Sequence, residues 1–300
     1  MIERKWCPIS GENSDVIFSR SYSAPELQKY ISVLSEPKIV IDKSYEIRYC
    51  KKSDFYFQTW VLDNIEILDL YNPSSKPDRF FNEIENKKLH AFSHLTEEIL
   101  VMRQLIQNRM PIVLDYGSSW GKWASMALAY GCDVYAVEVD SLAADFCKSR
   151  GIKLITHQQI KEYKFDFINV DQVMEHLNDP KETALNLTQS LKSGGFMKWS
   201  TPQSNTIQKQ LISAERDGSY YIFEGKRLKD LEPLVHVNLF SNYSLKYLAK
   251  TVGLECVNLP FWKWFGAGQL WNMPRQLNRN LITPWKRWRA LDSYLWFRKK

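Results

Sequence analysis

The sequence predicts an α/β fold built on a doubly wound, mostly parallel β-sheet. The first observation is a short apolar run, Val113–Tyr116, followed by a loop of small residues and an amphipathic stretch that reaches Tyr130. The second is that further apolar runs alternate with helical patterns along residues 132–201. Parallel strands need long crossover connections, usually helices, so this alternation is typical of a parallel sheet.

Periodicity and turn residues place the other elements of this domain. Apolar positions recur every three or four residues between Asn82 and Asn108, which predicts a helix leading into the first strand. Asp179-Pro180, with Glu182 three residues after the aspartate, is a capping-box-like helix start. Strands are expected over 132–138, 152–156, 165–170, 196–202 and 254–259, and helices over 122–130, 141–150, 180–191 and 244–251.

The loop after the first strand indicates a cofactor site. A dinucleotide fingerprint requires G-x-G-x-x-G, but after Gly117 this loop has Ser119 and Lys122 at the second and third glycine positions, which argues against NAD. The spacing D-x-G-x-S-x-G instead resembles the D-x-G-x-G-x-G loop of class I S-adenosylmethionine (SAM) methyltransferases, with serine as the middle residue. The resemblance implies that SAM is bound by Asp115, Gly117, Ser119 and Gly121.

Two more acids stand at the ends of predicted strands. Glu138 lies 17 residues after Gly121, and its two carboxylate oxygens suit the two hydroxyls of a ribose. Asp171 follows the fourth strand, at the end where open α/β sheets bind ligands. We expect both acids to bind the cofactor. Members of this class often use an acid to contact the adenine amino group, whereas here only His157–Gln159 stand near that point.

Three later motifs narrow the resemblance. Residues 175–180 read E-H-x-x-D-P, residues 191–202 read L-K-x-G-G followed by S-T-P, and residues 236–241 read H-x-x-x-F-S. In this order they resemble the ubiquinone-type and sugar methyltransferase families, over residues 110–203 and again beyond residue 236. The resemblance implies a Rossmann-like, seven-stranded, mostly parallel sheet and a methyltransferase that acts on a small molecule.

The same motifs supply the candidate catalytic residues. Transfer of a methyl group from a sulfonium requires that the acceptor is oriented and that its proton is removed. Histidine is the natural base near neutral pH, so His176 is the first candidate, with Glu175 beside it and His236 as a second candidate. A structural role for each of these residues stays open, because buried imidazoles and carboxylates also bond backbone groups.

Gln172 indicates both whether a metal binds and which acceptor is expected. In the ubiquinone-pathway enzymes an acid can stand three residues before the glutamate of the Glu-His pair, where a metal binds, whereas this chain has Gln172. A neutral amide is a weaker ligand than a carboxylate, so metal-assisted methylation of a catechol is less favoured and we expect no metal. The expected acceptor is a sugar or a glycan or natural-product precursor, including a nucleotide- or lipid-linked sugar.

Residues 1–83 form the expected N-terminal subdomain. Cys7-Pro-Ile-Ser10 and Cys50-Lys-Lys-Ser53 have the spacing of two halves of a zinc ribbon, with serine in place of the second cysteine of each pair. Many sugar methyltransferases carry such a zinc knuckle before the catalytic domain, and this segment resembles a degenerate one. Serine hydroxyls are poor zinc ligands, so we expect a metal-free, β-rich subdomain packed by aromatic residues.

The remaining segments are a methyltransferase domain over 84–260 and a basic extension over 261–300. The extension holds six of the eleven tryptophans and nine Lys or Arg against one acid. Such a composition fits packing on the domain or a peripheral contact with an anionic membrane surface, and nucleic acid is less favoured because no RNA-binding motif is present. The first residues have no apolar signal segment, which predicts a cytoplasmic protein, with the inner membrane surface as an alternative site.

The alternative to an enzyme is a binding protein. A SAM-fold protein without catalysis would act as a membrane-surface or complex partner through its basic extension. Ser119, the missing adenine acid and the lost cysteines are the features that favour this alternative.

Overall fold

The computed structural model describes residues 1–32, 34, 36–63, 66–67, 89–106, 110–202, 207, 232–258 and 294–300. Most of the basic extension therefore lies outside the described residues. The chain divides into two compact units. Unit 1 comprises Met1–Pro73, Gln172–Ala184 and Thr201–Val252, and unit 2 comprises Ser74–Asp171, Leu185–Ser200 and Gly253–Lys300.

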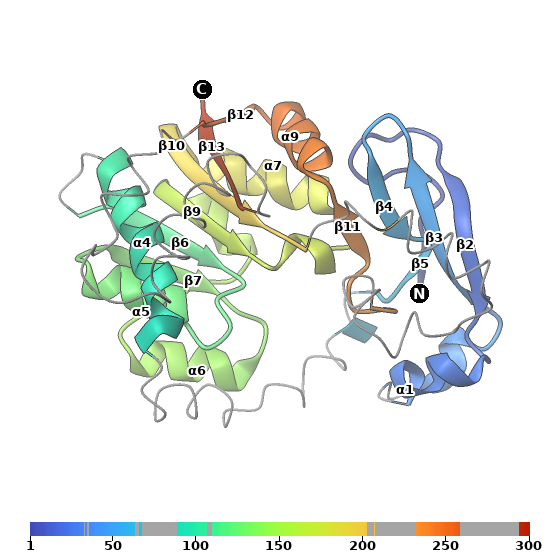
Figure 1. Ribbon diagram of the computed structural model, residues 1–300. Coiled ribbons are helices and arrows are strands. Elements are labelled where there is room, and N and C mark those ends of the chain that lie inside the picture. Colours follow the sequence, from blue (N-terminus) through green and yellow to red (C-terminus); the bar gives the residue numbers. More distant parts are fainter. Residues whose placement is uncertain are drawn as a thin grey trace, which may run out of the picture. The chain divides into compact units, whose positions relative to one another are not determined.

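Unit 2 contains a mixed seven-stranded sheet with the order β12-β13-β10-β9-β6-β7-β8 (Figure 1). Strands β10, β9, β6, β7 and β8 pair in parallel, and β13 pairs antiparallel with both β10 and β12. The predicted α/β fold with a seven-stranded sheet is thereby confirmed. The strands are β6 (Ile112–Tyr116), β7 (Asp133–Val137), β8 (Lys153–Leu154), β9 (Phe165–Asp171), β10 (Leu191–Ser200), β12 (Leu254–Cys256) and β13 (Tyr294–Lys299).

The helices of unit 2 follow the predicted order. They are α4 (Leu89–Leu105), α5 (Lys122–Ala129), α6 (Ser141–Ser149) and the 3-10 turn η3 (Gln158–Glu162), while α7 (Pro180–Ser190) begins in unit 1 and ends in unit 2. In Figure 1, α4 and α5 lie against the strands on the same side of the sheet. Their apolar faces form one core with the sheet, in which Ile99 and Met102 of α4 and Trp123 of α5 are buried.

Several element boundaries differ from the prediction. Strand β10 begins at Leu191 rather than at Phe196, and its pairing with β9 shifts register between these two residues, where Gly194 has a positive φ of 74°. The preceding helix, predicted to reach residue 191, ends at Ser190 instead. Strands β8 and β12 are shorter than predicted, because each pairs with one neighbour over two or three residues only.

The helix expected over 244–251 starts earlier, as α9 (Asn242–Thr251). Ser241 is its N-cap: the Ser241 hydroxyl accepts from the Ser244 N–H at 3.0 Å, and the Ser244 hydroxyl accepts from the Ser241 N–H at 2.7 Å. This capping box satisfies two backbone donors of the first turn, so the helix begins directly after Ser241.

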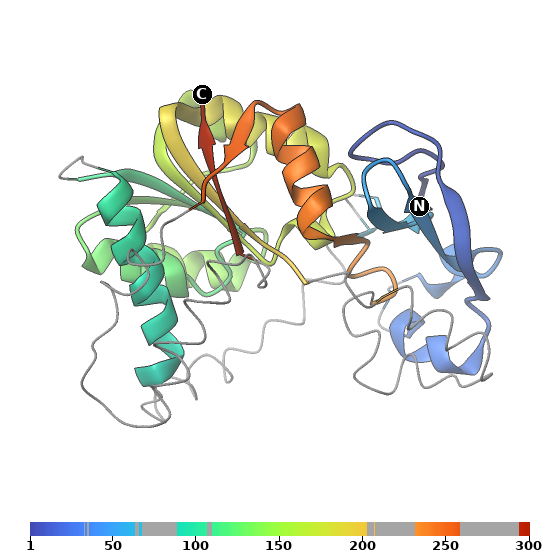
Figure 2. The same cartoon turned by 45° about the horizontal axis from the view of Figure 1, so that its top comes forward.

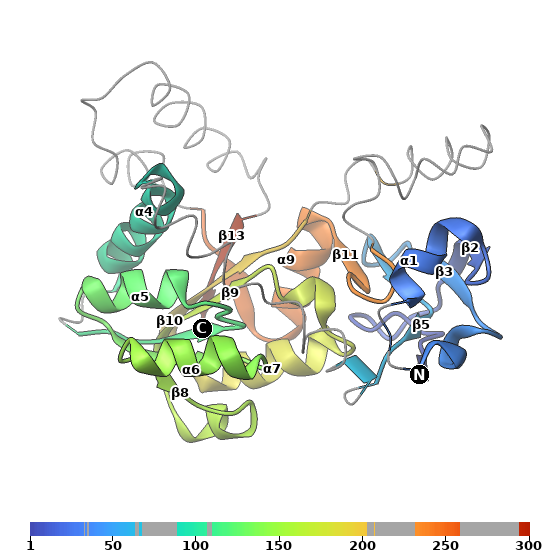
Figure 3. The ribbon, with the colours of Figure 1, turned by 90° about the horizontal axis from the view of Figure 1, so that it is seen from below.

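Unit 1 contains a four-stranded antiparallel sheet with the order β11-β4-β3-β2. Its strands are β2 (Asp15–Ser21), β3 (Ser44–Cys50), β4 (Phe55–Gln58) and β11 (Asn238–Phe240), and β1 (Ile2–Glu3) pairs separately with β5 (Trp60–Val61). Three short helical turns accompany them: η1 (Pro25–Leu27), α1 (Gln28–Ile31) and η2 (Pro37–Val40). Leu27 and Ile31 pack with Tyr45 and Ile47 in one core, and Figure 3 shows α1 beside β2 and β3.

The last residues of the chain form part of the sheet of unit 2. Figure 2 shows β13, in red, beside the yellow strand β10. Trp296 of β13 is 3 % exposed, and its ring lies 5.2 Å from that of Phe167, which also stacks on Trp123. At this position a tryptophan of the basic segment packs in the core.

We expect Trp296→Ala to lower the free energy of unfolding of the chain by about 3–5 kcal/mol, because it removes a large buried ring and leaves a cavity. Trp6, which is 63 % exposed, provides a matched control, and Trp6→Ala should change stability by less than about 1 kcal/mol. Urea unfolding monitored by circular dichroism measures both. Equal effects of the two variants would contradict the packing of β13.

Candidate functional site

The loop between β6 and α5 has a backbone that favours glycine. Gly117, Ser119 and Gly121 have φ values of 75°, 48° and 64°, so the serine occupies the left-handed region that glycine adopts without strain. A Cβ on Gly121 would lie 2.7 Å from the Cys147 sulfur, which leaves no room for a side chain. The N–H groups of Gly117 and Ser118 donate to the Val137 carbonyl at 2.9 and 3.1 Å, which ties the loop to the end of β7.

Glu138 follows β7 and lies against this loop. Its Oε2 accepts from the Ser119 N–H at 2.6 Å, and its Oε1 accepts from the N–H groups of Val139 and Asp140 at 2.8 Å each. Three backbone donors therefore fix the carboxylate. Glu138 therefore lies beside the loop between β6 and α5 and is held there by backbone hydrogen bonds.

Asp115 and Asp171 lie at the same edge of the sheet, near the carboxyl ends of β6 and β9. Asp115 is buried and accepts a hydrogen bond of 2.8 Å from the Asn169 amide. Burial raises the pKa of Asp115 to about 7, the bond from Asn169 opposes this shift, and the nearby Asp171 adds to it. A cation bound here would favour the ionised form of Asp115.

A buried ion pair supports these acids. Lys198 in the middle of β10 is fully buried, and its Nζ lies 2.6 Å from Glu98 Oε2 and 3.8 Å from Asp171 Oδ1. The Ser200 hydroxyl donates to the same oxygen of Asp171. Sequence reasoning missed Asn169 and Lys198, although a polar residue inside an otherwise apolar strand could have revealed both.

The residue near the expected adenine contact is His157, at the start of η3. Its Nδ1 lies 3.0 Å from the Tyr116 hydroxyl, and the two rings are in edge contact. Tyr116, which follows Asp115 in the loop motif, thus orients the side chain of His157. His157 stands where the resemblance implies an acid that contacts the adenine amino group.

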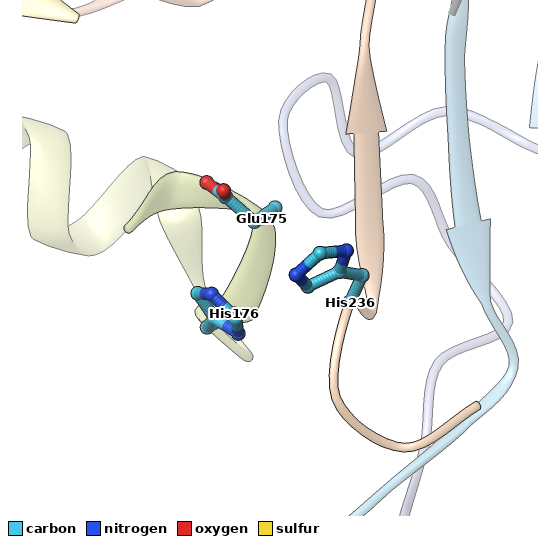
Figure 4. Close-up of side chains that lie close together, drawn as sticks. All are labelled: Glu175, His176 and His236. Atoms are coloured by element: carbon cyan, nitrogen blue, oxygen red, sulfur yellow. The ribbon is translucent and has the colours of Figure 1, made fainter. Parts of the chain in front are cut away.

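Unit 1 brings together the three candidate catalytic side chains. Glu175 and His176 belong to the 3-10 turn η4 (Met174–His176), which follows β9 along the chain, and His236 precedes β11. One ligand-type atom from each residue lies within 4.8 Å of the other two (Figure 4). The two imidazole centroids are 4.7 Å apart, and Glu175 is 1 % exposed. This set of donors suits acid–base chemistry or a transition-metal ion.

His176 is held in one tautomer. Its Nδ1 lies 3.0 Å from the Val235 carbonyl, and since a carbonyl only accepts, Nδ1 carries the hydrogen and Nε2 keeps a lone pair. The pKa of His176 is lowered to about 4, mainly by burial and in addition by the nearby His236, while the bond to Val235 opposes the shift. The ring is therefore neutral at pH 7, which is the protonation state that a base needs.

Arg4 and Asn238 position the two segments that carry this cluster, and sequence reasoning did not find either residue. The buried Arg4 guanidinium donates to the carbonyls of Asn178, at 3.2 Å, and Val237, at 2.7 Å. The Asn238 amide donates to the carbonyls of Met174 and Leu177 at 2.9 and 2.6 Å, and its oxygen accepts from Arg4 at 2.9 Å. The cluster therefore rests on polar contacts between residues distant in sequence.

Comparison with protein families finds one match. The model of the family described as "Methyltransferase domain" matches residues 81–259, more than half of the chain. The chain belongs to the methyltransferase-domain family. This membership makes the protein a methyltransferase and does not favour a role without catalysis. A comparison with curated proteins gave no match.

Solved structures with a similar fold are distant. The plantazolicin methyltransferase BpumL in complex with SAH is 15 % identical, with a TM-score of 0.45 over 76 % of this chain and 91 % of that one. The YcgJ protein from Bacillus subtilis is 13 % identical, with a TM-score of 0.42 over 69 % and 99 %. A SAM-dependent methyltransferase from Mesorhizobium loti is 10 % identical, with a TM-score of 0.42 over 66 % and 95 %. No conclusion about substrate follows at this level of likeness.

The lowered pKa of His176 predicts a pH dependence of stability. Between pH 6.5 and about 4 the unfolded chain binds a proton at His176 and the folded chain does not, so the free energy of unfolding should fall as the pH drops through this range. The loss attributable to this residue has an upper limit of about 3 kcal/mol. His176→Gln should remove that part of the pH dependence, whereas His94→Gln should not.

Urea unfolding of the wild type and both variants at pH 7 and at pH 4.5 provides the measurement. An unchanged pH dependence in the His176 variant would show that the ring titrates normally in the folded chain.

Proposed function

We propose that this methyltransferase uses SAM to methylate a small molecule, a sugar or a glycan or natural-product precursor. The cofactor supplies a methyl group activated on a sulfonium sulfur. The observation that carries the proposal is the loop Gly117–Gly121 with Glu138 beside it, in a chain of the methyltransferase-domain family.

The residues of unit 2 fit this cofactor. The loop has left-handed φ values at Gly117, Ser119 and Gly121, a backbone formed by glycine and small residues that would let a ligand approach closely. Glu138 would bind the ribose hydroxyls, and Asp115 and Asp171 would provide negative charge for the cationic end of the cofactor. Tyr116 and His157 are the groups nearest to the expected adenine position, where a hydrogen bond between them fixes the histidine.

The acceptor class is supported by the residues around the Glu-His pair. Gln172 stands where a metal-binding acid would favour a catechol, so the proposal is an acceptor that does not require a metal. The motifs of residues 175–180 and 236–241, together with the two C-x-x-S turns of unit 1, resemble those of sugar methyltransferases. A nucleotide- or lipid-linked sugar in polysaccharide biosynthesis is the acceptor that we propose to test first.

His176 is the proposed general base. Its Nε2 carries the lone pair that would take the acceptor proton, because Nδ1 donates to the Val235 carbonyl. Glu175 and His236 are the adjacent groups that would stabilise or relay this proton, since each offers an atom within 4.8 Å. Arg4 and Asn238 would hold this geometry during turnover.

The segment 261–300 is proposed as a basic extension of the methyltransferase domain at 84–260, with residues 1–83 as a separate subdomain. Residues 294–299 of the extension form β13, and most of the others lie outside the described residues. Within the described part of the chain, no helix has the length and apolar content of a membrane span. Peripheral contact of the extension with an anionic membrane would suit a lipid-linked acceptor.

Glu138→Ala is expected to weaken SAM binding by about 100-fold, because the charge-assisted hydrogen bonding between the carboxylate and the ribose is lost. Isothermal titration with SAM and with S-adenosylhomocysteine measures this effect. Glu138→Gln should bind with intermediate affinity, and Glu162→Ala, which changes an exposed acid outside the loop, should bind like the wild type. Wild-type affinity in Glu138→Ala would exclude the ribose contact.

His176→Gln is expected to lower turnover by about 10²–10⁴-fold with SAM affinity unchanged, as removal of a general base does. The assay measures release of S-adenosylhomocysteine with an acceptor found by screening sugar nucleotides. His94→Gln serves as the histidine control. Full turnover in His176→Gln would exclude the essential base, and loss of wild-type turnover on treatment with a chelator would point to metal ligation by the cluster instead.

A further inference from the structure

Four side chains of the two C-x-x-S turns meet in unit 1. We call Cys7, Ser10, Cys50 and Ser53 the thiol–hydroxyl tetrad. The Cys7 sulfur lies 3.3 Å from the Ser53 hydroxyl, and the Ser10 hydroxyl lies 3.4 Å from the Cys50 sulfur. Both thiols and Ser53 are buried. The two turns are 43 residues apart in sequence, yet they place their four side chains in one cluster.

The backbone of both turns resembles that of a metal-binding knuckle. The residue after each C-x-x-S has a positive φ: Gly11 at 73° and Asp54 at 49°. The Gly11 N–H donates to the Cys7 carbonyl at 2.7 Å. Backbone N–H groups of Ile9 and Ser10 also bond the Cys7 sulfur, and that of Ser53 bonds the Cys50 sulfur. The turns thus direct amide donors at sulfur, as a site for thiolates requires.

The side chains of the tetrad do not fit zinc. A structural zinc site is closed by four ligands of the cysteine, histidine or carboxylate type, and the tetrad offers two thiols and two hydroxyls. A serine hydroxyl stays neutral in the pH range where a thiol ionises, so it does not provide an anionic ligand for zinc. Two of the four positions therefore lack a usable ligand atom.

We propose that hydrogen bonds within the tetrad take the place of a metal ion, so that unit 1 keeps a zinc-ribbon arrangement without metal. Burial raises the pKa of the Cys7 thiol. At Cys50 burial acts in the same direction, but bonds from Ser10, Ser53 and the Cys7 thiol outweigh it and lower the pKa. In the geometry of the tetrad, each thiol lies beside the hydroxyl of the other turn: Cys7 beside Ser53 and Cys50 beside Ser10.

Conversion of the tetrad into a zinc site tests this proposal. We expect the full-length double variant Ser10→Cys/Ser53→Cys to retain about one zinc ion per chain after dialysis, as four converging cysteines do. The wild type, expressed in the same zinc-supplemented medium, should retain no stoichiometric zinc. The triple variant with Cys50→Ala in addition is the control and should bind zinc much more weakly. Elemental analysis and the charge-transfer absorption of Co²⁺-loaded samples measure these outcomes.

Two results would overturn the proposal. The first is stoichiometric zinc in the wild type together with a lower unfolding midpoint after chelation, which would show that the tetrad binds metal as it stands. The second is a folded double variant, judged by circular dichroism, that takes up no zinc. If the double variant does not fold, the wild type decides: its urea midpoint should be unchanged by chelator and lowered by Cys50→Ala. The test is independent of SAM and acceptor, so its failure leaves the proposed function untouched.

Discussion

The parallel pairing of β6 with β7 and β9 is the constraint on which the proposed cofactor site depends. Parallel strands end at the same edge, so Asp115, Glu138 and Asp171 are brought together although they span more than fifty residues of sequence. Burial raises the pKa of Asp115, and the negative charge of the nearby Asp171 raises it as well. The buried Lys198 offsets part of this repulsion, and it is itself neutralised by Glu98 of α4. The helix before the first strand therefore contributes to the electrostatics of the site.

In unit 1 the hydrogen bonds of a buried guanidinium, rather than the pairing of parallel strands, order the turns that carry the candidate residues. Arg4 is fully buried, and burial lowers its pKa to about 9, with partial compensation from Cys7 and Asp179. The described contacts of its guanidinium are carbonyl oxygens of Gln58, Asn178 and Val237 and the side-chain oxygen of Asn238. A donor with several fixed N–H groups satisfies carbonyls that would otherwise be buried without partners. The N-terminal segment thus orders the turns that carry the candidate catalytic residues.

Local patterns were sufficient where neighbouring residues decide the structure. The run Val113–Tyr116 and the small residues after it gave the strand and loop, and the spacing of Glu138 gave its place beside that loop. Contacts between distant residues were not predictable in this way. Strand β11 completes the sheet of unit 1 from residues 238–240, and β13 joins the sheet of unit 2 from the end of a segment whose composition indicates an extension. Arg4 carries no local pattern that distinguishes it from a surface cation.

The low pKa of His176 is compatible with its proposed role as a general base, because the acceptor would lose its proton late in the reaction. If the acceptor is a neutral hydroxyl, formation of the bond from its oxygen to the methyl carbon, with loss of the bond from that carbon to the sulfonium sulfur, would leave the oxygen positively charged and its proton strongly acidic. A base with a pKa of about 4 then accepts the proton downhill. A more basic histidine would be protonated in part of the molecules before the reaction, and that fraction could not act as a base. Burial next to His236 thus keeps the ring neutral and Nε2 unprotonated before the reaction, at a basicity that this late proton transfer tolerates.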